Sequence, residues 1–122
     1  MNNTLVPDTN AIIYFLGENP SVVPLLDEKI HYISVISEIE VLGFDFKTQN
    51  DEYAVKRYLR NVKIIPLNSE IKEIAISLKK NYKAKVGDAI VCATAIYFDL
   101  PVISADKNFK KIKELKLVYF TP

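Results

Sequence analysis

This 122-residue sequence has little cysteine or histidine and no long apolar run. It contains one cysteine, Cys92, and one histidine, His31. A single cysteine excludes an intramolecular disulfide, and the two residues offer no cluster of nitrogen and sulfur ligands for zinc. No stretch approaches the roughly 20 apolar residues that cross a bilayer, and the N-terminus lacks the basic start and apolar segment of a signal peptide. We therefore expect a cytoplasmic protein with no membrane partner.

The sequence also has little net charge, although its charges are unevenly distributed. The formal net charge is +1 at pH 7, and 49% of the residues are hydrophobic, as in an ordinary globular protein. The length predicts one domain over residues 1–122. Residues 79–122 hold 9 basic and 4 acidic residues, against 7 and 11 in residues 1–78. A basic C-terminal third fits contact with a polyanion, or a lysine-rich helix surface in solvent.

Short apolar runs alternate with amphipathic patterns along the chain. Strands are expected just before Asp8 and over residues 31–35, 62–67, 101–104 and 117–120. Helices are expected over residues 11–16, 22–26, 37–46, 53–60, 69–82, 88–98 and 108–115. The alternation predicts an α/β fold, a three-layer α/β/α sandwich with a mainly parallel central sheet. The helix over 88–98 is apolar nearly all round, so we expect it to be buried, with Cys92 in the core.

Four acidic residues occupy corresponding positions in this pattern: Asp8, Glu40, Asp88 and Asp106. Asp8 and Asp106 follow strands, whereas Glu40 and Asp88 lie near the starts of helices. Because the carboxyl ends of parallel strands share one edge of a sheet, the four can converge there. Each also has a structural explanation: a helix cap, a capping box from Ser37 to Glu40, a helix-dipole partner and a turn residue, respectively.

Convergence of four carboxylates would create strong repulsion, which a divalent cation relieves. Mg²⁺ or Mn²⁺ prefers oxygen ligands and keeps water in its coordination shell. A cation held in this way can activate water for phosphodiester hydrolysis. The lysines around Asp88 and Asp106, among them Lys85 and Lys107, are candidates for contacts with substrate phosphates.

Four short motifs in order carry a resemblance to a known family. They are Leu-Val-Pro-Asp-Thr-Asn at 5–10, Ser-Val-Ile-Ser-Glu-Ile-Glu-Val-Leu-Gly at 34–43, Gly-Asp-Ala-Ile-Val-Cys-Ala-Thr-Ala at 87–95 and Pro-Val-Ile-Ser-Ala-Asp at 101–106. At these residues the chain resembles the PIN-domain ribonucleases, most closely the VapC-type toxins of toxin–antitoxin pairs. Two departures from the family pattern, Pro7 and Ser37, leave the acidic set intact.

The resemblance implies a single PIN-like nuclease domain that cuts RNA as a Mg²⁺- or Mn²⁺-dependent endoribonuclease. It also implies a homodimer and a cognate antitoxin. It implies that Asp8, Glu40, Asp88 and Asp106 are catalytic residues and that the three aspartates bind the metal. It places Asn10 and Ser104 at positions that meet the substrate.

Two other α/β families fit the sequence less well. A response-regulator receiver domain needs an acidic pair after its first strand and an aspartate after its third, where this chain has Asn68. A haloacid-dehalogenase-type phosphatase needs a second acid where this chain has Asn10. An RNA-processing PIN nuclease without an antitoxin and a catalytically silent PIN-like binding module remain as alternatives.

Overall fold

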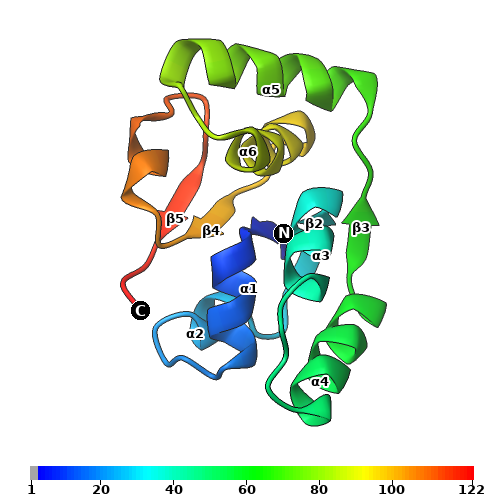
Figure 1. Cartoon of the computed structure of the whole chain (residues 1–122). Coiled ribbons are helices and arrows are strands. Elements are labelled where there is room, and N and C mark those ends of the chain that lie inside the picture. Colours follow the sequence, from blue (N-terminus) through cyan, green and yellow to red (C-terminus); the bar gives the residue numbers. More distant parts are fainter. Residues whose placement is uncertain (1–2) are drawn as a thin grey trace.

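A five-stranded parallel sheet forms the centre of the molecule in the computed structural model, which describes residues 3–122 (Figure 1). Its strands are β1 (Thr4–Pro7), β2 (Ile30–Ser34), β3 (Lys63–Ile65), β4 (Val102–Ser104) and β5 (Leu117–Tyr119). They are arranged in the order β3-β2-β1-β4-β5, and every neighbouring pair is parallel. The predicted α/β sandwich on a parallel sheet is therefore confirmed.

Helices connect the strands and cover the sheet. They are α1 (Thr9–Leu16), α2 (Val23–Leu26), α3 (Val35–Leu42), α4 (Gln49–Arg60), α5 (Ser69–Tyr82), α6 (Val86–Phe98) and the 3₁₀ helix η1 (Lys107–Lys111). Figure 1 shows α5 and α6 together at one end of the view, with α1, α2 and α4 at the other. Within residues 3–122, none of these helices has the length and apolar character to span a membrane.

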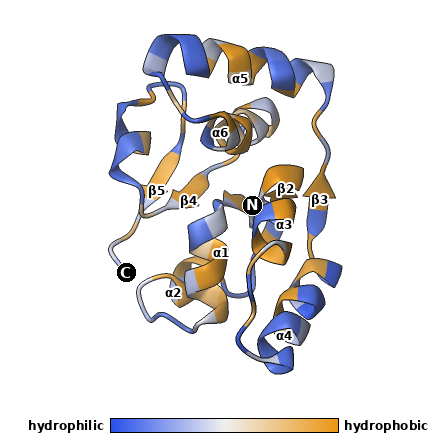
Figure 2. Cartoon of the chain, viewed as in Figure 1, coloured by the Kyte–Doolittle hydropathy of each residue, from blue (hydrophilic) through white to orange (hydrophobic). Residues whose placement is uncertain are grey.

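Alternating side chains of the strands divide the core between the two faces of the sheet. Val6 and Val102 pack with residues of α5 and α6, whereas Leu5 and Ile103 pack with residues of α1 and α2. This alternation follows from the period of two in a strand. Figure 2 shows hydrophobic residues concentrated in the strands and hydrophilic residues along much of α4. Residues Ala89–Ala95 of α6 are all buried, Cys92 included, as the sequence predicted.

Several predicted helix boundaries are wrong, each for a local reason. The helix expected over 37–46 begins at Val35, because the hydroxyl of Ser34 rather than Ser37 caps it by accepting from the Ile36 N–H. The helix expected over 53–60 begins earlier, at Gln49, with Thr48 as its cap. The helix expected over 108–115 is the shorter 3₁₀ helix η1.

Candidate active site

The strand order creates a switch point beside β1. From β1 the chain moves outward through β2 and β3, then returns to place β4 on the opposite side of β1. In open parallel sheets, ligands bind outside the carboxyl ends of the strands at such a point. Asp8 directly follows β1, and Asp106 lies two residues beyond the end of β4. The topology alone therefore brings these two predicted residues to one crevice.

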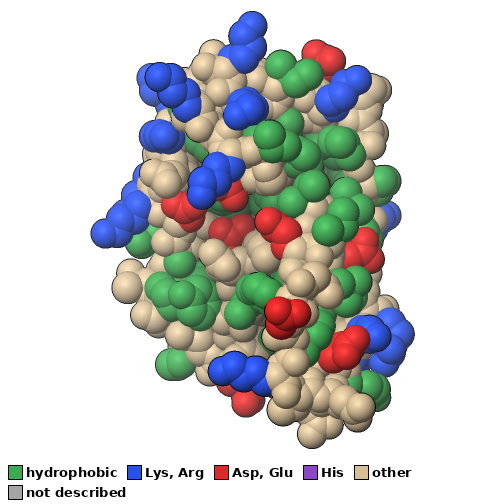
Figure 3. Space-filling view, in the orientation of Figure 1, with side chains coloured by type: hydrophobic (Ala, Val, Ile, Leu, Met, Phe, Trp, Pro, Cys, Tyr) green, Lys and Arg blue, Asp and Glu red, His purple; other side chains and the backbone are tan. Residues whose placement is uncertain are grey.

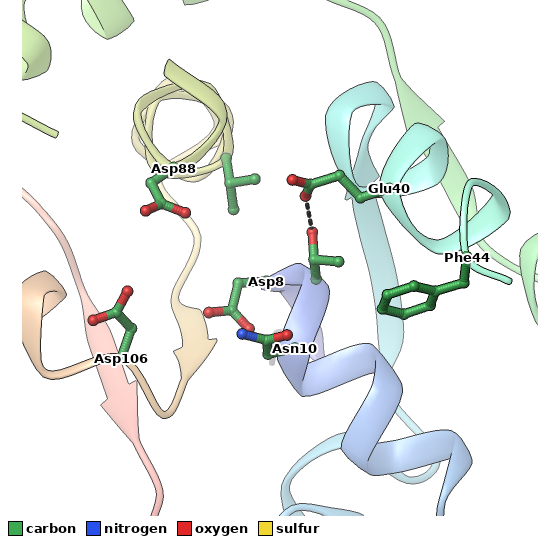
Figure 4. Close-up of a pocket in the computed structure, with 8 residues that line it drawn as sticks. Asp8, Asn10, Glu40, Phe44, Asp88 and Asp106 are labelled. Atoms are coloured by element: carbon green, nitrogen blue, oxygen red, sulfur yellow. Dashed lines mark hydrogen bonds between the residues drawn. The ribbon is translucent and has the colours of Figure 1, made fainter. Parts of the chain in front are cut away.

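A cavity of about 370 Å³ lies at this crevice. Acidic side chains gather at the middle of this face of the molecule, with basic side chains on one side and hydrophobic ones on the other (Figure 3). All four predicted acids line the cavity and point into it from different segments (Figure 4). The complete lining is Asp8, Thr9, Asn10, Glu40, Phe44, Asp88, Val91 and Asp106, so every charged residue in it is negative.

Asp8 is both a helix cap and a member of this cavity. Its Oδ1 accepts a hydrogen bond of 2.8 Å from the Ala11 N–H, and its Oδ2 accepts one of 2.5 Å from the Ser104 hydroxyl. Only 7% of the residue is exposed. The pKa of Asp8 is raised to about 6, chiefly by burial and to a smaller extent by the charges of Asp88 and Asp106, while the two hydrogen bonds oppose the rise.

Asp88 and Asp106 complete the aspartate set. Asp88 lies in the first turn of α6, and burial raises its pKa, as do the charges of Asp106 and Glu40, while Lys85 opposes the rise. Asp106 caps η1 by accepting from the Asn108 N–H, and its own N–H donates to the Ser104 hydroxyl at 3.0 Å. Ser104 thus fixes Asp8 and the backbone of Asp106 relative to each other.

Glu40 reaches the cavity from the second turn of α3, not from the first turn as its predicted capping box required. The Thr9 hydroxyl donates a short hydrogen bond to Glu40 Oε1, and Ser37 Oγ lies 3.0 Å from Thr9 Oγ1. Because a hydroxyl carries one proton, Ser37 donates to Thr9 when Thr9 donates to Glu40. Ser37 is fully buried. The hydroxyl groups of Ser37 and Thr9 thus orient the carboxylate of Glu40, although Glu40 is an exposed residue.

The remaining predicted residues occupy different environments. Asn10 lines the acidic cavity, and Lys85 lines a neighbouring one. Ser104 is 0% exposed, so the prediction that it contacts the substrate is wrong. Its hydroxyl instead donates a hydrogen bond to the carboxylate of Asp8. Lys107, the first residue of η1, lines neither cavity.

The sequence reasoning missed Thr9 and Ser37 as site residues. The available signal was that Thr9 directly follows Asp8 and that Ser37 precedes Glu40 by three residues. On a helix, residues three apart lie on the same face.

The chemistry of the cavity fits a hard divalent cation, because its charged donors are all carboxylates. The pKa values of Asp8 and Asp88 are raised chiefly by burial and also by repulsion from neighbouring carboxylates, and a cation would relieve that repulsion. Over residues 3–122, however, no three His, Cys, Asp or Glu side chains are grouped closely enough to form a ready-made ion site. The prediction that the acids meet at a single point is therefore wrong: they line one shared cavity. Their side chains would have to rotate for three of them to contact one ion.

Comparison with known proteins extends the similarity to the whole chain. The profile of the PIN domain matches residues 5–115. Ribonuclease VapC2 of Methanocaldococcus jannaschii is 26% identical over 95% of this chain and 93% of its own length. A toxin–antitoxin complex from Klebsiella pneumoniae contains a chain that is 28% identical, with a TM-score of 0.80, over 93% of this chain and 95% of that one. VapBC2 from Rickettsia felis, bound to promoter DNA, has the same fold at 17% identity, with a TM-score of 0.83, over 97% and 99% of the two chains.

Proposed function

The chain belongs to the PIN domain family, and from that premise we propose that it is a divalent-metal-dependent endoribonuclease and the toxin of a toxin–antitoxin pair. The observation that carries the proposal is the cavity at the switch point, where Asp8, Glu40, Asp88 and Asp106 arrive from four separate segments. The names of two relatives, a ribonuclease and a toxin–antitoxin complex, support the same assignment. We further propose that residues 1–122 act as one nuclease domain.

We propose that Asp8, Asp88 and Asp106 hold the cation, which is Mg²⁺ or Mn²⁺. When bound, the ion would lower the pKa of the attacking water and offset the charge that develops on the phosphate. Asp8 is fixed for this role by its bonds to Ala11 and Ser104. Asp88 is fixed by its place on the most buried helix, α6.

Glu40 acts on the water rather than on the ion in this mechanism. Its carboxylate is held by the Thr9 hydroxyl and faces the cavity (Figure 4). It accepts a proton from the water that attacks the phosphorus atom, as a general base within hydrogen-bond reach of its target can. Asn10, on the same cavity wall, can donate an amide N–H to a phosphate oxygen.

The partners of the chain follow from the same proposal. RNA is the substrate, a cognate antitoxin is the inhibitor, and the chain pairs as a homodimer. Phe44, which lines the acidic cavity, is 50% exposed, and Ile39, the residue before Glu40 in α3, is 61% exposed. Large apolar side chains left in solvent are typical of surfaces that another protein covers.

An RNA cleavage assay with matched variants tests the activity. End-labelled single-stranded RNA is incubated with the purified protein in Mg²⁺, Mn²⁺ or EDTA, and the products are mapped. Cleavage is expected only with metal, and it should be lost in Asp88→Asn and Glu40→Gln. The control is Glu38→Gln, which removes the same charge from α3 but lies outside the cavity lining. Full activity in EDTA or in Asp88→Asn would overturn the proposal.

The toxin role needs a separate measurement in cells. Expression of the chain alone should arrest growth, and expression of Asp8→Asn should not. Co-expression with the product of the adjacent reading frame should restore growth. Growth without arrest, together with metal-dependent cleavage in vitro, would favour an RNA-processing enzyme over a toxin.

A further inference from the structure

A second cavity, of about 160 Å³, lies beside the acidic one and shares two of its walls, Asp88 and Asp106. Its complete lining is Lys83, Ala84, Lys85, Asp88, Asp106, Asn108, Phe109, Lys111 and Ile112. The acidic cavity has four carboxylates and no basic residue, whereas this one sets three lysines against the two shared aspartates. The sign of the charge therefore changes from one cavity to the next. Space for several water-sized groups is present, since one water occupies about 30 Å³ in the liquid.

The three lysines converge on this second cavity from two separate segments. Lys83 and Lys85 belong to the connection between α5 and α6, and Lys111 ends η1. Within residues 3–122 the salt bridges join Lys56 to Glu52 and Lys116 to Asp99, so none of the three cavity lysines is committed to one. The charge of Lys85 opposes the rise that burial causes in the pKa of Asp88, so an anion would share this lysine with that carboxylate.

The backbone at Lys83 allows its side chain to be removed without straining the fold. Lys83 ends α5 in the left-handed conformation, with φ of 56°, and its N–H donates to the Lys79 carbonyl. Glycine is the usual residue at such a position because a Cβ is disfavoured there. Glu18, Glu28 and Asp99 adopt the same conformation, so it assigns no role by itself. It does make Lys83→Gly a substitution that the backbone favours.

We propose that the second cavity binds the RNA phosphate adjacent to the one that is cleaved. The inference rests on the proposed nuclease function and adds the path of the substrate. From the acidic cavity, the RNA strand would run toward the α5–α6 connection and η1. Lysine ammonium groups and the Asn108 amide are suitable donors to phosphate oxygens. On the other side of the acidic cavity, Phe44 and the exposed residues of α3 supply no basic group.

The charge contribution is tested by RNA binding in EDTA, where no metal-dependent cleavage occurs. For a single strand, each phosphate contact contributes about 0.7 to the slope of log K against log salt. Because the three lysines share one phosphate, replacing them together (Lys83→Gly, Lys85→Gln and Lys111→Gln) should lower that slope by about 0.7 and weaken binding about fivefold at 0.1 M salt, and each single substitution should produce part of that loss. The control is Lys72→Gln, which removes the same charge from α5 beside a different, apolar cavity. Lys83→Gly should keep or raise the melting temperature, so its weaker binding cannot be attributed to unfolding.

The position of the phosphate is tested with neutral backbone substitutions. Single methylphosphonates are placed on either side of the mapped cleavage site. In the wild type, neutralising the adjacent phosphate on one side should slow cleavage, and in Lys83→Gly that same substitution should have a smaller effect, because one of the donors to that phosphate is already gone. Equal sensitivity of the wild type and Lys83→Gly at every position would overturn the subsite.

The two proposals can fail separately. If RNA is cut but the cavity lysines behave like Lys72, the subsite is wrong and the nuclease stands. If no RNA is cut but the slope falls only for the cavity lysines, the nuclease is wrong and the anion site stands.

Discussion

Replacing Asp8 with asparagine should stabilise the metal-free protein while abolishing its activity. The carboxylate is 7% exposed and lies near two other aspartates, and burial raises its pKa from about 3.8 to about 6. Each pKa unit corresponds to about 1.4 kcal/mol, so ionising Asp8 at pH 8 costs the fold about 3 kcal/mol. Asparagine keeps the shape of the neutral acid without that cost.

The sign of the pH dependence follows from the raised pKa. The folded pKa of Asp8 lies above the unfolded value, so its contribution to stability is complete below about pH 4 and is lost as pH rises through about 6. Asparagine does not titrate, and its amide must donate to Ser104 Oγ where the carboxylate accepted. We therefore expect Asp8→Asn to gain about 1–3 kcal/mol at pH 8 and little or nothing at pH 4.

Thermal and urea unfolding in EDTA measure this difference. For a chain of this length, an unfolding entropy of about 2.1 cal/mol/K per residue converts the gain at pH 8 into roughly 4–12 °C. Asp45→Asn is the control, because Asp45 is exposed and outside the cavity lining, and it should change stability by less than about 0.5 kcal/mol. A loss of stability in Asp8→Asn at pH 8, or a difference that does not vary with pH, would refute the reasoning.

Four further outcomes are expected. Thr9→Val should reduce single-turnover cleavage about 10- to 100-fold while Thr9→Ser stays close to wild type, because only the hydroxyl orients Glu40; equal rates in the two variants would contradict this. Mn²⁺ at 100 times its dissociation constant should stabilise the wild type by about 2.7 kcal/mol in urea unfolding and leave Asp8→Asn unaffected, and an equal gain in both would exclude Asp8 as a ligand. Burial lowers the pKa of His31, so its contribution to stability is present above about pH 6.5 and lost as pH falls; on the Asp8→Asn background, His31→Gln should remove that loss between pH 7 and 5, and an unchanged pH profile would count against it. Leu78→Ala should cost 2–5 kcal/mol in urea unfolding, because Leu78 is 1% exposed in the core, and a cost under 1 kcal/mol would show that the site collapses around the missing atoms.

The fold could be predicted because its signals are local. Strands such as β1 and β4 are short apolar runs, and helices such as α5 carry their apolar residues at helical spacing. The helix type near the C-terminus was harder to predict. Phe109 and Ile112 are buried three residues apart, a spacing that suits one turn of 3₁₀ helix as well as an α-helix.

The acidic residues of the site were also within reach of the sequence, because their places after strands and at helix starts fix where they lie. The hydrogen-bonding partners were not. Ser104 was expected to meet the substrate, and Ser37 was expected to cap a helix. Ser37 lies inside α3 because the helix begins two residues earlier than expected. Ser104 ends β4 as expected, and its side chain turns inward because the carboxylate of Asp8, just after the neighbouring strand, accepts its proton. A contact of this kind, between residues far apart in the sequence, leaves no local pattern from which it could be predicted.

The bond from Ser104 to Asp8 joins residues 96 positions apart, and β1 lies between β2 and β4 in the sheet. A ribosome makes Asp8 96 residues before Ser104. Until β4 has been synthesised, the carboxylate of Asp8 therefore lacks the hydroxyl group that orients it, and β1 has only β2 to pair with. The last step in assembling this site is consequently the docking of β4 against β1.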